Sequence, residues 1–200
     1  MKAVLLDVPD RVIDERRQRG LDRRDEVWEG VYHMVPPPDF EHQRVAGDLF
    51  EFLRAYCRRH RLGVIHFGLG VRDRHSADEN YRIPEWLFLR SGRENLLRPA
   101  SGYVDAGPDA VLEVRSPGDE TDDKIPFYER MGVVEMIVIE RNPHQIRLLR
   151  LRRRRLRAVA PDENGWVRSE TLQVRFRTTR RDGRPVLMVR LERDGVVHTM

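Results

Sequence analysis

Three charged residues lie in segments that are otherwise largely apolar, and their types suit metal-dependent hydrolysis. Glu85 lies within residues 82–90, RIPEWLFLR, and Glu113 lies near the end of residues 109–115, DAVLEVR. Burying an unpaired carboxylate is costly, so each glutamate needs a partner. Two carboxylates that meet at one edge of a sheet can bind a hard divalent cation such as Mg²⁺. Lys124 follows Glu113 by eleven residues and is the third candidate.

Lys124 is unusual because this chain otherwise uses arginine for positive charge. Only two of its 37 basic residues, Lys2 and Lys124, are lysines. Phe127, Tyr128 and Met131 follow Lys124 at spacings of three, four and seven residues, which places the lysine on the apolar stripe of a helix. We therefore expect its ammonium to face the sheet and to pair with Glu113.

The chemistry that such a set performs is metal-assisted hydrolysis of a phosphodiester. A divalent ion polarises the phosphate and lowers the pKa of a bound water. A compact ammonium stabilises the hydroxide or the developing charge, for which the larger, planar guanidinium is a poorer substitute. The alternative is structural: a buried ion pair between Glu113 and Lys124, with Glu85 reaching solvent.

The elements that position these residues are predicted by periodicity. Residues 26–34 alternate as a strand with a turn at Glu29–Gly30, and Asp39 is a suitable N-cap for a helix that runs to about His60. His42 lies on the buried stripe of that helix, either as a core residue or near the site. The other members of the stripe are Val45, Ala46, Leu49, Leu53, Tyr56 and Cys57.

The central elements follow in the order expected of a mixed sheet. Residues 63–72, 82–90, 109–115 and 134–139 read as strands, with a helix over about 122–131. Strand, helix and strand within about thirty residues form a βαβ unit with a right-handed crossover. Residues 144–157 and 170–199 read as antiparallel strands that extend the same sheet, with hairpin turns at Asp182–Gly183 and Asp194–Gly195.

Residues 26–140 resemble the Uma-two family of putative restriction endonucleases, within the PD-(D/E)xK nuclease superfamily. The pieces that carry the resemblance are WEGVYHM, FEHQ, RIPEWLFL, PDAVLEVRSP and DDKIPFYERMGVVEMIVIE. The resemblance implies a restriction-endonuclease-like core, a sheet flanked by helices. It also implies Glu85 and Glu113 as metal carboxylates and Lys124 as a catalytic lysine displaced from strand to helix.

The same resemblance points to accessory residues and to two departures from the family pattern. Glu29 and His42 occupy the matching turn and helix positions and are candidates for orienting water or ligands. Glu85 stands where the family usually has aspartate, which is one methylene shorter. Arg115 stands where other superfamily members carry the catalytic lysine, so it either contacts phosphate or takes no part.

Composition limits the remaining choices. The chain has 200 residues, 40% hydrophobic and 35% charged, a net charge of +4 and a single cysteine, Cys57, so no intrachain disulfide forms. We expect a cytoplasmic protein without a membrane segment. Its expected organisation is a polar N-terminal segment (1–24), the core (25–142) and a β extension of the same domain (143–200).

The leading hypothesis is thus an endonuclease that uses Mg²⁺ or Mn²⁺ and acts on DNA. The alternatives are a non-catalytic nucleic-acid-binding descendant, and a structural or regulatory dimer in which the charged set is only an ion-pair network. The seven arginines among residues 147–157 either follow a phosphate backbone or form a solvated strand and turn. The sequence leaves homodimer formation open.

Overall fold

The computed structural model describes residues 3–5, 8–98, 101–115, 120–141 and 144–200, which fold into three sheets and three α-helices. Residues 116–119, which follow the strand predicted over 109–115, lie outside these residues. The helices are α1 (Asp10–Gln18), α2 (Phe40–Arg59) and α3 (Ile125–Met131), and two 3₁₀ turns span Glu94–Leu96 and Thr121–Lys124. In the described part of the chain, no helix is long and apolar enough to cross a membrane.

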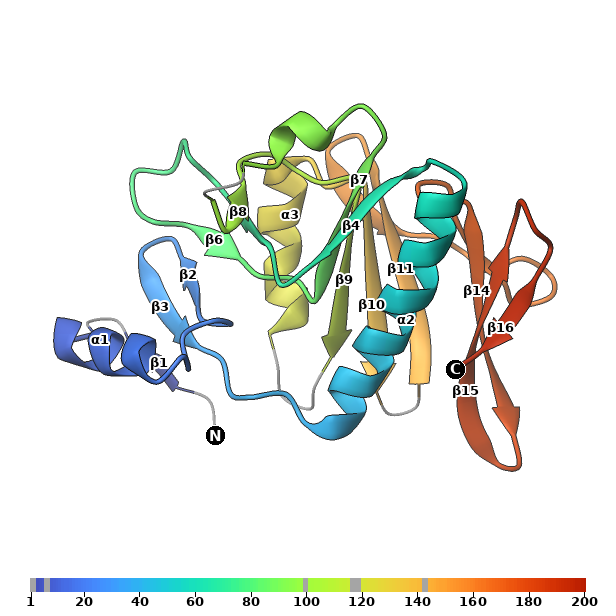
Figure 1. The fold of residues 1–200 in the computed structure, drawn as a ribbon, viewed down its shortest axis with the longest axis horizontal. Coiled ribbons are helices and arrows are strands. Elements are labelled where there is room, and N and C mark those ends of the chain that lie inside the picture. The colour runs from blue at the N-terminus through green and yellow to red at the C-terminus, as the bar shows by residue number, and fades with distance from the viewer. Residues whose placement is uncertain (1–2, 6–7, 99–100, 116–119, 142–143) are drawn as a thin grey trace.

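The central sheet has six strands in the order β12-β11-β10-β9-β7-β4 (Figure 1). Their bounds are Gly63–Phe67 (β4), Trp86–Arg90 (β7), Ala110–Arg115 (β9), Glu135–Arg141 (β10), His144–Arg152 (β11) and Arg155–Ala158 (β12). Strands β9 and β10 are parallel and are joined through α3, which confirms the predicted strand–helix–strand unit. The other pairs in this sheet are antiparallel.

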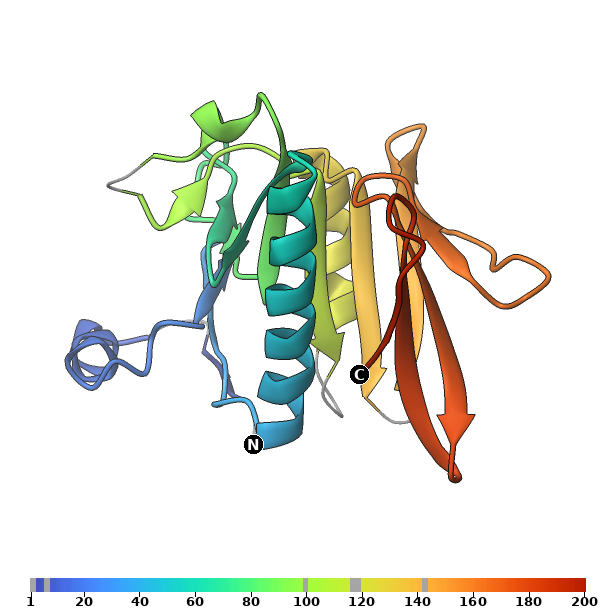
Figure 2. The same ribbon diagram turned by 45° about the vertical axis from the view of Figure 1, so that its right-hand side comes forward.

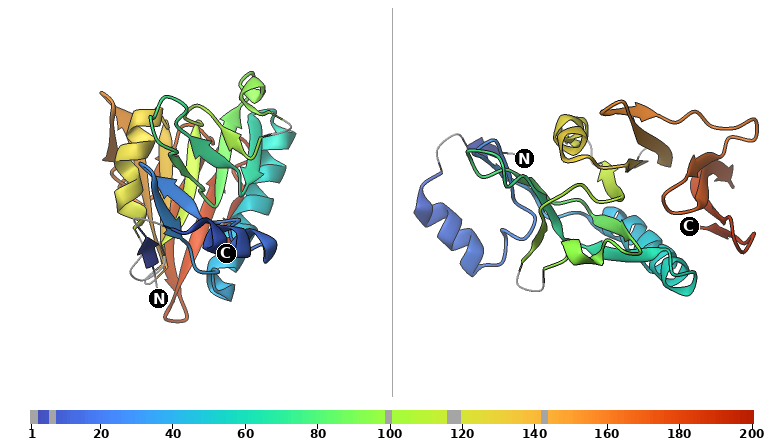
Figure 3. Two further views of the ribbon diagram at one scale, coloured as in Figure 1. Left: turned by 90° about the vertical axis from the view of Figure 1, so that its left-hand side faces the viewer. Right: turned by 90° about the horizontal axis from the view of Figure 1, so that it is seen from above.

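Helices α2 and α3 lie on opposite sides of this sheet (Figure 3). The Asp39 side chain accepts a hydrogen bond from the His42 backbone N–H, so the predicted N-cap forms, and His60 ends the helix. The six predicted stripe residues and His42 are all buried. Helix α3 ends at Gly132, whose φ of +81° is left-handed and favours glycine.

A second sheet, order β1-β3-β2-β6-β5-β8, lies beside the central one and holds the N-terminal hairpin. Its strands are Ala3–Leu5 (β1), Glu26–Trp28 (β2), Val31–Met34 (β3), Gly70–Arg72 (β5), Tyr81–Arg82 (β6) and Tyr103–Val104 (β8). The strands predicted over 63–72 and 82–90 therefore each divide between two sheets. The chain crosses between the sheets at Gly68–Leu69 and at residues 83–85, so Glu85 occupies a junction rather than a strand interior.

The C-terminal strands divide in a way that the sequence did not predict. Strands β11 and β12 extend the central sheet, as expected, but the last strands form a separate four-stranded antiparallel sheet. Its strands are Val167–Ser169 (β13), Val174–Arg181 (β14), Arg184–Leu191 (β15) and Val197–Thr199 (β16). Figure 2 shows this sheet as a layer beside the central one. The alternating apolar residues of β14 and β15 explain the layer, because face-to-face packing buries one side of each strand.

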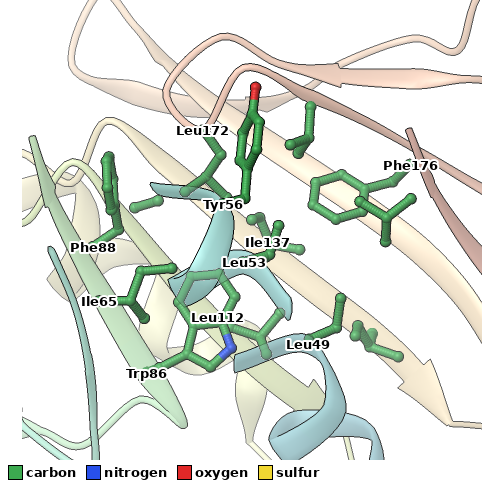
Figure 4. Close-up of a cluster of buried hydrophobic side chains, with 14 of the residues drawn as sticks. Leu49, Leu53, Tyr56, Ile65, Trp86, Phe88, Leu112, Ile137, Leu172 and Phe176 are labelled. Atoms are coloured by element: carbon green, nitrogen blue, oxygen red, sulfur yellow. The ribbon is translucent and has the colours of Figure 1, made fainter. Parts of the chain in front are cut away.

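Two apolar clusters fill the two sides of the central sheet. The first lies between the sheet, α2 and the C-terminal sheet, and includes Leu53, Trp86, Leu112 and Phe176 (Figure 4). The second lies on the α3 side and includes Leu87, Val111, Phe127 and Tyr128. Trp86 and Phe88 belong to the first cluster, and Leu87 and Leu89 belong to the second. Glu113 lies on the α3 side, where Tyr128 contacts it.

Candidate active site

Glu85 and Glu113 lie close together where β7 begins beside β9. The register of β7 and β9 ends with Trp86 paired to Leu112, and Glu85 directly precedes β7. The backbone N–H of Glu85 donates to the Leu112 carbonyl at 3.0 Å, so Glu85 lies beside the residue that precedes Glu113. The charge of Glu85 contributes to the raised pKa of Glu113. Both glutamates are buried, at 7% and 4% exposure.

Lys124 joins this pair from the turn that precedes α3. Its Nζ lies 3.2 Å from both carboxylate oxygens of Glu113. The residue is the N-cap of α3, and Pro126 sits in the first turn, where a missing N–H disrupts no helical hydrogen bond. The predicted inward orientation and the pairing with Glu113 are therefore present. Tyr128, one turn later, is buried as a core residue, and its hydroxyl donates to Glu113 Oε1 at 2.6 Å.

A third carboxylate, Glu26, was missed by the sequence reasoning. Its Oε1 accepts from Lys124 Nζ at 2.8 Å and from the Ile83 backbone N–H at 2.7 Å. Its Oε2 accepts from Trp28 Nε1 at 2.8 Å, and the side chain is 2% exposed. The sequence feature that indicates Glu26 is its position at the start of a short strand, next to the apolar Val27. The family resemblance points instead to Glu29, at the turn with Gly30.

Glu29 lies at that turn and outside the cluster. Its side chain is 58% exposed, and its Oε1 accepts from Arg130 and Asn80 at 2.8 and 3.2 Å. Its φ of +46° suits the tip of the hairpin that connects β2 and β3. The structure thus assigns Glu29 contacts in the hairpin, whereas Glu26, three residues earlier, points to Lys124.

Glu85 is held by His42 and Arg24. His42 Nε2 lies 2.5 Å from Glu85 Oε1, so the predicted accessory histidine reaches the cluster. Arg24 Nη1 donates to both oxygens of Glu85 at 3.0 and 3.1 Å. Arg24 belongs to the segment 1–24, which the sequence predicts only to be polar, and in a chain with 35 arginines nothing in the sequence singles it out.

Arg115 lies two residues beyond Glu113 but makes other contacts. Its guanidinium pairs with Glu140 of the adjacent strand at 3.2 Å and with Asp122. Arg147 of β11 also pairs with Asp122. Arg115 is therefore part of a charged network next to the cluster, and no hydrogen bond joins it to Glu85 or Glu113 in the described residues.

The electrostatics of the cluster leave negative charge in excess. Burial raises the pKa of Glu113 to about 7; the charges of Glu26 and Glu85 act in the same direction, and Lys124 and Tyr128 oppose them. Burial alone would lower the pKa of Lys124, but Glu113 and Glu26 outweigh it and raise that pKa. Lys124 therefore remains an ammonium at neutral pH, and a single ammonium serves two carboxylates.

Glu85 behaves differently from Glu113. Burial alone would raise its pKa, but the hydrogen bond from His42 and the charge of Arg24 outweigh burial and lower it. Glu85 is accordingly ionised at neutral pH. Each carboxylate oxygen has more than one acceptor site, so contacts with His42 and Arg24 leave room for a further ligand.

The donor set fits a hard divalent cation. Mg²⁺ favours carboxylate oxygens and is usually held by one or two of them, with water and substrate phosphate completing the shell. Glu85 and Glu113 supply two such carboxylates, and the raised pKa of Glu113 reflects a site that would gain from another positive charge. Within the described residues, no three His, Cys, Asp or Glu side chains are already grouped as a metal site.

Comparisons with known proteins agree with the geometry. The sequence profile of the Uma2 family, described as "Putative restriction endonuclease", matches residues 14–181. Among solved structures, a putative nuclease belonging to DUF820 from Anabaena variabilis ATCC 29413 is similar, with a TM-score of 0.59 and 15% identity. The similarity covers 74% of this chain and 82% of that chain, and it confirms the expected fold class. No curated protein matches the sequence.

Proposed function

Because the chain belongs to the Uma2 family of putative restriction endonucleases, we propose that it hydrolyses DNA phosphodiester bonds with the help of Mg²⁺ or Mn²⁺. The observation that carries the proposal is the closeness of the buried Glu85 and Glu113, with Lys124 paired to Glu113. The family match supports the reaction class, and the paired carboxylates support the metal. DNA is the proposed substrate.

In this proposal, the chain's own residues bind the cation, orient the carboxylates that hold it and stabilise negative charge. Glu85 and Glu113 would hold the cation, which would polarise the phosphate and lower the pKa of a water. Lys124 carries a fixed positive charge beside Glu113 and stabilises negative charge that develops during attack. Because its pKa is raised, Lys124 does not accept the proton of the water. Tyr128 orients Glu113, and His42 orients Glu85.

A second function is favoured by one observation. Each carboxylate of the cluster already has a cationic partner in the protein, Arg24 for Glu85 and Lys124 for Glu26 and Glu113. Such pairing is what a non-catalytic descendant needs to keep buried charges satisfied. On that alternative the protein binds nucleic acid without turnover.

The test compares nicking of plasmid DNA by the wild-type protein and by Lys124→Arg, with Mg²⁺, with Mn²⁺ and with neither. We expect divalent-dependent nicking by the wild type and a loss of about 10²–10³-fold in the variant, because a planar guanidinium cannot occupy the position between Glu26 and Glu113. Melting temperatures establish that both proteins are folded. Equal nicking by both would remove Lys124 from the reaction, and no nicking by the wild type would favour the non-catalytic alternative.

A further inference from the structure

Positive charge is concentrated at the C-terminal end of the chain. Residues 144–200 contain 15 of the 37 basic side chains and 6 of the 33 acidic ones, a net charge of +9. Residues 1–143 contain the other 22 basic and 27 acidic side chains, a net charge of −5. The candidate active site lies in the acidic part, where the many carboxylates repel a polyanion. A DNA substrate therefore needs attraction from elsewhere in the molecule.

The hairpin of β11 and β12, residues 150–157 and here called the arginine hairpin, carries the densest part of that charge. Its two-residue turn consists of Arg153 and Arg154, with φ of +50° and +63°. A turn with positive φ at both central residues favours Asn-Gly, because other side chains are strained there. Arginine at both positions sacrifices backbone stability, and strain of this kind is concentrated at functional sites.

The strands of the arginine hairpin place like charges opposite one another. The register pairs Arg150 with Arg157 and Arg152 with Arg155. Opposed like charges destabilise an antiparallel pair. Arg153, Arg154 and Arg157 are exposed, and none of them has an acidic partner within 4.0 Å among the residues that the structure describes. Three guanidinium groups thus remain available to an anion.

The arginine hairpin is anchored to α3 and lies at the opposite end of the central sheet from Glu113. Glu129 of α3 accepts from Arg155 Nη1 at 2.8 Å and from the Leu156 backbone N–H at 2.7 Å. Leu149 and Leu156 pack in the same apolar cluster as Tyr128, on the α3 side of the central sheet. The register of the central sheet places Glu113 beside Val138 and Val138 beside Arg147. The tip at Arg153 is six residues further along β11, about 20 Å away, which spans about six phosphates of one DNA strand.

We infer that the arginine hairpin is a phosphate-binding surface that holds the DNA backbone about six nucleotides from the scissile bond. The inference rests on the proposed function for the identity of the polyanion. Arg153 and Arg154 at the tip and Arg157 on the adjoining strand neutralise phosphates without reading bases. Their contribution is affinity and register, and the chemistry remains with the carboxylate cluster.

The test uses a variant that should improve the fold while it removes the contact. Arg153→Asn combined with Arg154→Gly installs the residues that the turn prefers, so we expect an unchanged or higher melting temperature. Binding to a short DNA duplex is measured by fluorescence anisotropy in EDTA, between about 50 and 200 mM KCl. Loss of two phosphate contacts should lower the salt slope by about 1.8 and weaken binding about 60-fold at 0.1 M salt.

The matched control is Arg58→Gln combined with Arg61→Asn at the end of α2, which removes two exposed arginines, one of them at a φ of +52°. We expect this variant to bind nearly as the wild type does. Wild-type affinity and salt slope in the hairpin variant would overturn the inference, as would equal losses in both variants. So would a hairpin variant that loses binding only to vesicles containing about one-third phosphatidylserine, since the surface would then bind membranes.

Binding in EDTA separates this inference from the proposed nuclease activity. If the hairpin variant loses DNA affinity and the wild type never nicks plasmid, the phosphate-binding surface stands and the catalytic proposal fails. If the wild type nicks plasmid and the hairpin variant binds DNA unchanged, the catalytic proposal stands and this surface does not.

Discussion

Replacing Glu113 with glutamine tests the electrostatics of the cluster directly. Burial raises the pKa of Glu113 from an ordinary value of 4.5 to about 7. The native state therefore binds more protons than the unfolded state between these pH values, and stability falls as the pH rises through them. Each pKa unit corresponds to about 1.4 kcal/mol, so ionised Glu113 lowers the free energy of unfolding by about 3 kcal/mol above pH 7.

Glutamine keeps the size of the side chain and cannot ionise. Its amide oxygen can still accept from Tyr128, and Glu26 still pairs with Lys124 at 2.8 Å. We therefore expect the free energy of unfolding of wild type minus that of Glu113→Gln to fall by about 3 kcal/mol between pH 4.5 and pH 8. Urea denaturation at intervals of half a pH unit measures this difference, and other titrating groups largely cancel in the subtraction.

A divalent ion supplies a second measurement on the same pair of proteins. A ligand that binds only the native state at a hundredfold excess over its Kd adds about 2.7 kcal/mol. Mg²⁺ should thus stabilise the wild type at pH 8, should stabilise it less at pH 5, where a proton competes, and should leave Glu113→Gln nearly unchanged. A stability difference that is flat or rises with pH would refute the reasoning, because attraction to Lys124 would then dominate over burial.

Two further predictions follow from contacts that the structure reveals. Glu26→Gln should lower the rate of nicking by about 10²-fold, because loss of its charge would let the Lys124 ammonium move by about 1 Å. Glu29→Gln, at the exposed turn, should nick as the wild type does, and equal rates in the two variants would remove Glu26 from the site. Glu135→Ala should lower the free energy of unfolding by about 3–5 kcal/mol, because the buried Glu135 carboxylate accepts from Arg150 and Ser169 and joins the C-terminal sheet to β10. Glu170→Ala, which removes an exposed partner of the same Arg150, should cost less than about 1 kcal/mol in urea denaturation, and a comparable loss in both would contradict this account.

The local elements were largely determined by the sequence, because periodicity and turn chemistry act over a few residues. The Asp39 cap, the buried stripe of α2 and the unit of β9, α3 and β10 follow from spacing alone. The pairing of Lys124 with Glu113 was also predictable, since both residues belong to that unit and an ammonium on an apolar stripe needs a nearby carboxylate.

Contacts between distant segments were decided only by the tertiary structure. Glu26 and Lys124 are 98 residues apart, and Arg24 and Glu85 are 61 apart, so no local pattern links them. In a chain with 35 arginines, neither residue type nor spacing distinguishes Arg24 from its neighbours.

The division of the strands into three sheets has the same origin. Alternating apolar residues in β14 and β15 show that one face of each strand is buried, but not which surface buries it. The apolar face of β14 and β15 packs against α2 and the central sheet. This face-to-face contact removes more apolar surface from water than hydrogen bonding to the edge of the central sheet would. The sequence thus determined the chemistry available at the site, and the packing of its layers determined which carboxylate faces which cation.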